Sequence, residues 1–157
     1  LSAFEVTFAI ILASVTRSFM IAAVCILVFA IFLDIQIDNI YYSLLYLFLG
    51  SFFLGAAGFI IGCHVKKFDE MSSYTNFIIQ PLVFLSGSFY SIEKLPKFLQ
   101  TISEYNPFFH MIDGFRFGFI GKSDGSISFG LIYLSLLCVV TWFITYILYK
   151  IGYKIKS

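Results

Sequence analysis

The sequence predicts an all-α polytopic membrane protein with four transmembrane helices. Of its 157 residues, 60% are hydrophobic and only 12% are charged, and the mean hydropathy is +0.94. A soluble domain carries about 25% charged residues, so this chain has too little polar surface to cover a water-soluble globule. Its net charge of +1 gives no electrostatic reason to expect a nucleic-acid partner. We therefore expect a single transmembrane domain in contact with membrane lipids.

Four apolar runs are candidates for the spans. A spanning helix needs about 20 apolar residues, because it rises about 1.5 Å per residue across a hydrocarbon core about 30 Å thick. Runs of this length predict spans at 40–63, 72–91 and 126–149. The run at 18–33 is shorter, but it is long enough if Arg17 snorkels to the interface and the helix begins upstream. Strands are not expected, because the runs are too long and do not alternate polar with apolar residues.

The placement of lysines predicts the orientation. Lys66 and Lys67 occupy one connector and three lysines lie near the C-terminus, whereas the connector "DIQIDN" has no basic residue. Because basic residues are enriched in cytoplasmic loops, both ends of the chain are expected to be cytoplasmic. The loop 92–125 is then outside, although it carries basic residues that are balanced by an equal number of acids.

Two features of the spans suggest contacts inside the membrane. Gly58 and Gly62 form a small-xxx-small pair, which lets a neighbouring helix of the same chain or of a second subunit approach closely. In the span 72–91, Pro81 predicts a kink, and Asn76 and Gln80 are amides that lipid does not tolerate unpaired. These two amides are interpreted equally well as lining a pathway or as hydrogen bonding between helices.

The loop 92–125 contains signals for two short helices. Leu95, Phe98, Leu99 and Ile102 share one helical face, and a second helix begins at Asn106, a predicted cap, and Pro107, which suits the first helical position. Asp113 and Arg116 are three residues apart and are expected to pair. The loop is therefore predicted to form a re-entrant or interfacial helical hairpin. The apolar face expected for its second helix comprises Phe108, Ile112, Phe115 and Phe119.

Chemical motifs argue against catalysis by this chain. Ser86, His110 and Asp113 could be imagined as a triad, but Phe84 stands where a G-x-S-G serine motif has glycine. His64 and His110 are expected on opposite sides of the membrane, which excludes a shared metal site. No G-x-x-x-x-G-K-S/T motif is present, so the chain is not expected to bind ATP itself. We therefore expect neither a catalytic residue nor a cofactor in this chain.

The stretch from Pro81 to Gly121 resembles the membrane subunits of bacterial ABC-2 type exporters. Four elements in order carry the resemblance: Pro81–Tyr90, Leu95–Pro96, Asn106–Pro107 and the D-x-x-R pair of Asp113 and Arg116. The opening "LSAFEVTFAIILASVTRS" is similar to the segment before the third span of that family. Because such permeases carry six spans, the chain is expected to be the C-terminal part of one.

The resemblance implies an exporter in the inner or plasma membrane. Two permease subunits, expected to be a homodimer, would pair around a pathway, and ATP and Mg²⁺ would be held by separate ATPase subunits. Residues 1–17 would form a cytoplasmic coupling segment that contacts the ATPase through Leu1, Ser2 and Glu5, with Lys66 and Lys67 as weaker candidates. Substrates of the family include polysaccharides, lipid-linked glycans and drugs. The alternative is a non-transporting membrane scaffold or assembly protein.

The resemblance also implies that the loop 92–125 is a re-entrant gate on the outer side. Phe108, Phe109, Phe115 and Phe119 would form an apolar seal at its second helix, which Asn106 and Pro107 begin. We further hypothesise that the pairing of Asp113 with Arg116 holds the orientation of that helix.

Overall fold

The computed structural model describes residues 2–32, 37–65, 67–88 and 96–152. Within these ranges the regular structure is helical and no strand is present, which confirms the predicted all-α class. The helices, in chain order, are α1 (Ala3–Phe32), α2 (Ile40–His64), α3 (Phe68–Tyr74), the π-helical turn η1 (Thr75–Ile79), α4 (Gln80–Phe84), α5 (Lys97–Glu104), α6 (Pro107–Ile120) and α7 (Ile127–Ile151).

In the described part of the chain, three helices are long and apolar enough to cross a membrane, namely α1, α2 and α7. They correspond to the predicted spans at 18–33, 40–63 and 126–149. The 30 residues of α1 make a helix about 45 Å long. The segment expected as cytoplasmic, residues 1–17, therefore belongs largely to the same continuous helix as the span that follows it.

The predicted span at 72–91 is helical but shorter than expected, so a count of four spans is not confirmed. Helical turns run from Phe68 to Phe84, and we call this segment, residues 68–84, the arm. The arm ends early because the chain turns at Leu85 and Gly87 adopts a left-handed conformation with φ of 74°, which glycine accommodates without a steric penalty. Residues 89–91 lie outside the described residues.

The arm contains an irregularity next to Pro81, where the sequence predicts a kink. The N–H of Gln80 donates to the carbonyl of Thr75, five residues back, as in a π-helix. Pro81 has no N–H to continue the regular ladder, and wide turns of this kind occur where that ladder is interrupted.

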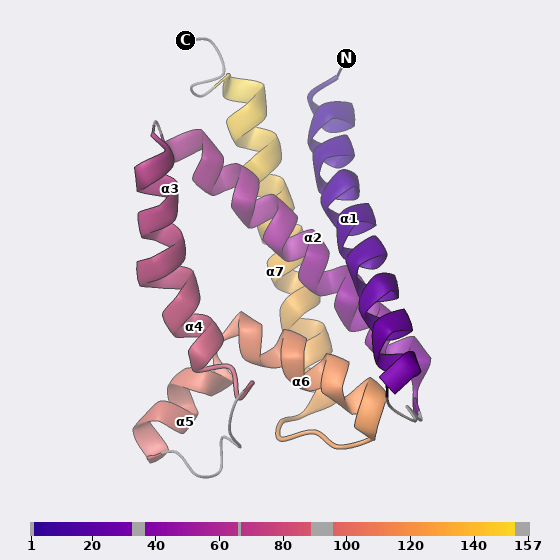
Figure 1. The fold of residues 1–157 in the computed structure, drawn as a ribbon. Coiled ribbons are helices and arrows are strands. Elements are labelled where there is room, and N and C mark those ends of the chain that lie inside the picture. Colours follow the sequence, from indigo (N-terminus) through magenta and orange to yellow (C-terminus); the bar gives the residue numbers. More distant parts are fainter. Residues whose placement is uncertain (1, 33–36, 66, 89–95, 153–157) are drawn as a thin grey trace.

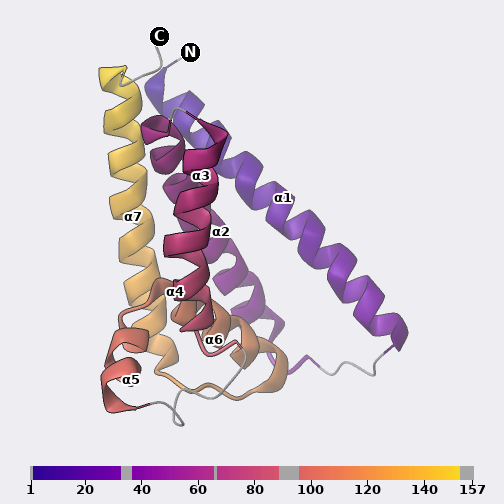
Figure 2. The same cartoon turned by 60° about the vertical axis from the view of Figure 1, so that its left-hand side comes forward.

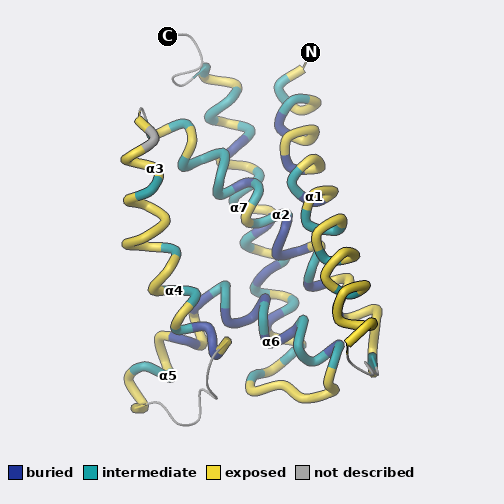
Figure 3. The backbone as a smooth tube through the Cα atoms, viewed as in Figure 1, coloured by how far each residue is buried: buried dark blue, intermediate teal, exposed yellow. Residues whose placement is uncertain are grey.

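Helix α2 is the centre of the packing and contacts α1, α6 and α7. One buried cluster joins Tyr46 and Leu49 of α2 to Leu134 and Cys138 of α7 and to Met111 of α6. A smaller cluster joins α1 to Ala56 of α2. Figure 3 shows that the buried positions gather where these four helices meet, whereas most of the arm is exposed. The outward faces of the long helices remain apolar, as expected for surfaces in contact with lipid.

The long helices and the arm alternate in direction. The start of α1, the end of α2, the start of α3 and the end of α7 lie at one end of the molecule, and α5, α6 and the turn before α7 lie at the other (Figures 1 and 2). The first of these ends also carries Lys67, which directly precedes α3. Which end is cytoplasmic stays a prediction.

The glycine pair predicted to mediate helix packing in α2, Gly58 and Gly62, has no close neighbour among the described residues. A Cβ placed on either glycine would meet no described atom within 4 Å. Close helix approaches are made instead by Gly55, whose Cβ would lie 2.8 Å from Ser14 Cβ of α1, and by two glycines of α6. The described helices of this chain therefore do not use the pair, and a helix of a second subunit stays a prediction.

Candidate functional site

Helices α5 and α6 form the hairpin, and its second helix, α6, begins where the sequence predicts. The side-chain oxygen of Asn106 accepts a hydrogen bond from the N–H of Phe108 at 3.0 Å, and Pro107 occupies the first turn. This N-cap satisfies one of the N–H groups that a helix start leaves without a partner. The helix ends at Gly121, which has a left-handed φ of 68°. The predicted start of α6 is confirmed.

Helix α6 lies directly on α2 because two glycines remove the side chains between them. A Cβ on Gly114 would overlap the ring of Tyr46, and a Cβ on Gly118 would lie 2.9 Å from the carbonyl oxygen of Asn39. The phenol of Tyr46 donates to the carbonyl of Ile127 at 2.7 Å, which joins the same contact to the start of α7.

The predicted pair of Asp113 and Arg116 forms, and it is part of a larger cluster. Arg116 donates to Asp113 at 2.6 Å and contacts Asp124 at 2.9 Å. The carboxylate of Asp113 also accepts the N–H groups of Asp124 at 2.8 Å and of Gly125 at 3.0 Å. Asp113 is only 3% exposed, so these donors replace the water that a buried charge loses. We call Asp113, Arg116 and Asp124 the acidic clamp.

The acidic residues of the clamp keep Arg116 charged. Burial by itself lowers the pKa of Arg116, but its hydrogen bonds to Asp124 and Asp113 and their negative charges raise that pKa above its usual value. Arg116 therefore remains a cation at any physiological pH. The clamp fixes the turn between α6 and α7 to the last part of α6.

His110 is packed between the end of α5 and helix α7. Its Nε2 lies 2.7 Å from the carbonyl oxygen of Glu104, at the turn between α5 and α6. Its ring contacts those of Phe129 and Tyr133 of α7. Ser86, the other part of the imagined triad, is hydrogen bonded to the hydroxyl of Ser88 at 2.8 Å and to the carbonyl of Val83. These contacts occupy both groups locally and give no support to a nucleophile–base pair.

The turn between α5 and α6 is also bonded to the end of the arm. The side-chain NH₂ of Asn106 donates to the carbonyl of Leu82 at 2.6 Å. The hydroxyl of Ser103 donates to the carbonyl of Leu85 at 2.9 Å. Both side chains are buried, Asn106 at 2% exposed and Ser103 at 0%. Asn106 thus makes one bond within α6 and one to the arm.

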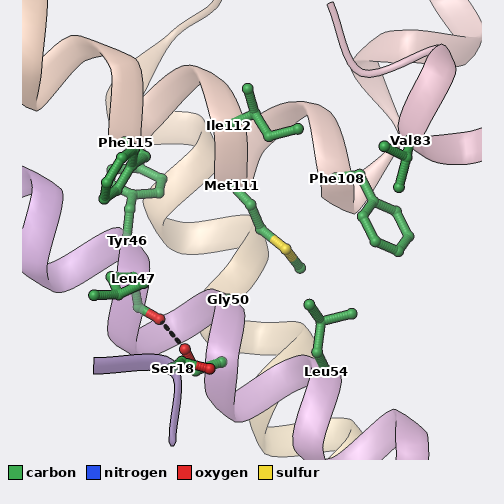
Figure 4. Close-up of a pocket in the computed structure, with 11 residues that line it drawn as sticks. Ser18, Tyr46, Leu47, Gly50, Leu54, Val83, Phe108, Met111, Ile112 and Phe115 are labelled. Carbon is green, nitrogen blue, oxygen red and sulfur yellow. Dashed lines mark hydrogen bonds between the residues drawn. The ribbon is translucent and has the colours of Figure 1, made fainter. Parts of the chain in front are cut away.

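An apolar cavity of about 450 Å³ lies between the arm, α1, α2 and α6. Figure 4 shows side chains of α6 on one wall, Leu54 and Gly50 of α2 on another, and Val83 of the arm at the side. Ser18 of α1 lies near the hydrogen bond from Ser51 to the carbonyl of Leu47. The α6 residues that line the cavity are Phe108, Met111, Ile112 and Phe115.

The predicted aromatic seal divides between two surfaces. Phe108 and Phe115 line the cavity, and the rings of Phe115 and Phe119 lie 4.8 Å apart. Phe109 is buried on another side, where a Cβ on Gly125 would lie 3.0 Å from its ring. The one-face pattern of Phe108, Phe115 and Phe119 is therefore compatible with the structure, whereas Phe109 packs toward the turn before α7.

The other predicted site residues lie away from the cavity. Asn76 and Gln80 are exposed on the arm. Ser2 and Glu5 start α1 with a reciprocal cap, since the N–H of Ser2 donates to the Glu5 carboxylate at 2.8 Å and the N–H of Glu5 donates to the Ser2 hydroxyl at 3.3 Å. Lys67 is exposed at the turn before α3. Leu1 and Lys66 lie outside the described residues.

A model of the ABC-2 type transporter family matches residues 1–120. The chain belongs to this family. The match includes α1, α2, the arm and the whole hairpin of α5 and α6, the part of the sequence on which the resemblance rests. No solved structure matches the chain.

Curated relatives agree with the family assignment. The chain is 39% identical over 93 residues to the inner membrane transport permease YadH of Escherichia coli, a match that covers 59% of the chain and 36% of that protein. It is 30% identical over 85 residues to the capsule polysaccharide export inner-membrane protein BexB of Haemophilus influenzae, covering 54% of the chain and 32% of BexB. It is 28% identical over 107 residues to nodulation protein J of Neorhizobium galegae, covering 66% and 41%. The chain thus spans well under half the length of these relatives.

Several residues that position α6 or line the cavity were not predicted from the sequence. The small-xxx-small spacing of Gly114 and Gly118 was a readable signal for the contact of α6 with α2. Asp124 could have been suspected as a second acid near Arg116. Tyr46 and Met111 gave no signal, because an aromatic or a methionine in an apolar helix is common.

Proposed function

We propose that the chain is part of the permease subunit of an ATP-binding cassette exporter, which moves substrate across the inner membrane with ATP hydrolysed by a separate subunit. The observation that carries the proposal is the family match over residues 1–120, which includes the hairpin that is hydrogen bonded to the arm and to the turn before α7. The name of YadH supports transport, and that of BexB supports export.

The hairpin of α5 and α6 is the proposed outer gate. Its second helix contributes Phe108, Met111 and Phe115 to the wall of the apolar cavity. Apolar side chains exclude water and ions from a constriction, which is the property that a resting gate needs. The acidic clamp and the N-cap at Asn106 hold the two ends of α6, so the seal is carried by a preorganised helix.

The opposite end of the molecule is the proposed contact surface for the ATPase. The capped start of α1 at Ser2 and Glu5 and the exposed Lys67 lie at that end, together with the end of α7. The basic connector and the basic C-terminal tail support its cytoplasmic orientation. Because α1 is continuous from Ala3 to Phe32, movement at its start would be transmitted along the helix into the membrane.

A second permease subunit completes the proposed transporter, most simply another copy of the same protein. The arm supports this arrangement, because Phe77 is 79% exposed and the amides of Asn76 and Gln80 are exposed beside it. An amide in the membrane must face protein or water. Polysaccharide is the first substrate to test, given the name of BexB, followed by lipid-linked glycans and drugs.

The test is reconstitution of the full-length protein with a candidate ABC ATPase, sought first in the neighbouring coding sequence. We expect the two proteins to copurify, and ATP hydrolysis by the ATPase to rise when the permease is present. We also expect ATP-dependent movement of substrate in proteoliposomes. If the pair copurifies but neither hydrolysis nor transport depends on the permease, the alternative of a membrane scaffold or assembly protein is correct instead.

A further inference from the structure

The described part of the chain divides into a packed body and an arm. Helices α1, α2, α6 and α7 pack on one another through α2. The arm, residues 68–84, packs mainly within itself and reaches the body through the contact of α4 with α6. Figures 1 and 2 show that the arm runs from one end of the molecule to the other, where α4 lies near the start of α6. The arm therefore has one well-defined attachment to the body besides its chain connections.

That attachment consists of hydrogen bonds to carbonyl groups at the end of the arm. In a regular helix the carbonyl of Leu82 would accept the N–H of Ser86, but this N–H bonds to the carbonyl of Val83 as the chain turns. The side-chain NH₂ of Asn106 takes the vacated position at 2.6 Å. The hydroxyl of Ser103 donates to the carbonyl of Leu85, the residue directly after the arm. Both carbonyls are part-buried, and a carbonyl away from water is costly without a donor, so these contacts hold the end of the arm in place.

We infer that Asn106 is a positioning residue that couples the arm to α6. Its amide group serves both elements at once: the oxygen caps the first turn of α6, and the nitrogen holds Leu82 of the arm. Val83 follows Leu82 in the arm, Phe108 lies two residues after Asn106 in α6, and both line the apolar cavity. The bridge through Asn106 therefore sets the spacing of the two walls of that cavity.

The consequence for transport rests on the proposed function. The arm connects the end of the molecule that carries Lys67 with the hairpin at the other end. The packed face of α6 is held on α2. A displacement of the arm would therefore reach the start of α6 through the hydrogen bond of Asn106. Asn106 is thus the point at which movement of the arm reaches the proposed gate.

The two roles of Asn106 can be separated by substitution. Asp is a good N-cap, so Asn106→Asp keeps the bond to the N–H of Phe108. It replaces the NH₂ donor by an acceptor that faces the carbonyl of Leu82. Asn106→Ser also keeps the cap and has too short a side chain to carry the second bond. The matched control is Ser126→Asp, because Ser126 caps α7 through the N–H of Phe129 and an Asp there changes a cap alone.

The experiment uses the full-length protein with its ATPase, with the native cysteines replaced and cysteines introduced at Val83 and Phe108. The first readout is the rate of cross-linking by a short bifunctional thiol reagent, with and without ATP. We expect Asn106→Asp and Asn106→Ser to slow cross-linking several-fold and to remove its dependence on ATP. The second readout, measured without the introduced cysteines, is the ratio of substrate moved to ATP hydrolysed, which we expect to fall several-fold. Ser126→Asp should change neither.

The outcomes separate the inference from the proposed function. If both Asn106 variants cross-link at the parental rate, Asn106 does not position the arm, whatever happens to transport. If the parental protein moves no substrate, the proposed function fails, and the cross-linking rates still decide the inference. Should both Asn106 variants fail to fold while Ser126→Asp folds, the inference is also overturned, because the role of Asn106 is then general stability.

Discussion

Gly114 of α6 lies against the ring of Tyr46 of α2, so closely that a methyl group at position 114 would overlap the ring. The contact sits in the buried cluster that joins α2 to α7. Without side chains at Gly114 and Gly118, the backbone of α6 can lie across α2 and hold the hairpin at one end of the molecule. The position of the proposed gate thus depends on the absence of two side chains.

Gly114→Ala is expected to destabilise the protein. The overlap must be relieved by moving either Tyr46 or α6, and overpacking of this kind costs about 1–3 kcal/mol. Gly58→Ala is the matched control, because a Cβ at Gly58 meets nothing within 4 Å. In a helix interior that change stabilises by up to about 1 kcal/mol. Thermal unfolding in detergent measures both, and equal midpoints for the two variants would contradict the close contact.

Tyr46→Phe removes the hydrogen bond to the carbonyl of Ile127 at the start of α7. We expect a loss of about 1–2 kcal/mol in the free energy of unfolding, because the buried carbonyl loses its side-chain donor. Tyr41→Phe removes a hydroxyl from a residue that is 83% exposed and should have little effect. Unfolding of both variants in the same detergent gives the comparison. A loss of the same size in Tyr41→Phe would show that the effect is not specific to the bond.

Exchange of the two charges in the acidic clamp is expected to fail. If pairing were the whole role of Asp113 and Arg116, the double variant Asp113→Arg with Arg116→Asp would restore what each single change loses. Asp113 also accepts the N–H groups of Asp124 and Gly125, which an arginine cannot accept. The double variant should therefore stay as sensitive to proteolysis in the turn 121–126 as Asp113→Ala. Full recovery in the double variant would reduce the clamp to a simple ion pair.

The stability that Arg116 contributes should not depend on pH between roughly 5 and 9. The pKa of Arg116 is raised in the folded protein above its value in the unfolded chain. Its contribution to stability is therefore fully present at any pH below the unfolded pKa, and it is lost only as the pH rises through the folded pKa. Arg116→Lys can be compared by the same proteolysis assay across this range. If the cleavage rate of the parental protein changes with pH in this range and that of Arg116→Lys does not, the expectation is contradicted.

Glu5→Gln tests whether Glu5 does more than begin a helix. Glutamine can retain the reciprocal cap with Ser2, whereas Glu5→Ala loses it at a cost of about 1 kcal/mol. If Glu5 contacts the ATPase through its charge, Glu5→Gln will lower permease-stimulated ATP hydrolysis several-fold with an unchanged unfolding midpoint. Normal stimulation in Glu5→Gln would limit the residue to capping α1.

Local features of the site were readable in the sequence because they depend on near neighbours. The cap at Asn106, the first-turn Pro107 and the pairing of Asp113 with Arg116 are set by residues within three positions. The three long spans follow from the length of apolar runs, which lipid imposes whatever the tertiary contacts are. The composition was enough for the membrane class, and the length of the apolar runs without polar alternation was enough for the all-α class.

Only the tertiary structure decided which of these local features act together. The second bond of Asn106 goes to a residue 24 positions earlier, and the second partner of Arg116 comes from the turn before α7. The arm ends at Phe84 because Gly87 turns the chain, although the apolar run continues. Gly58 and Gly62 match the helix-packing pattern as well as Gly114 and Gly118 do, yet among the helices that the structure describes only the second pair meets a neighbour. Spacing along a helix tells which residues share a face, and the fold determines what that face meets.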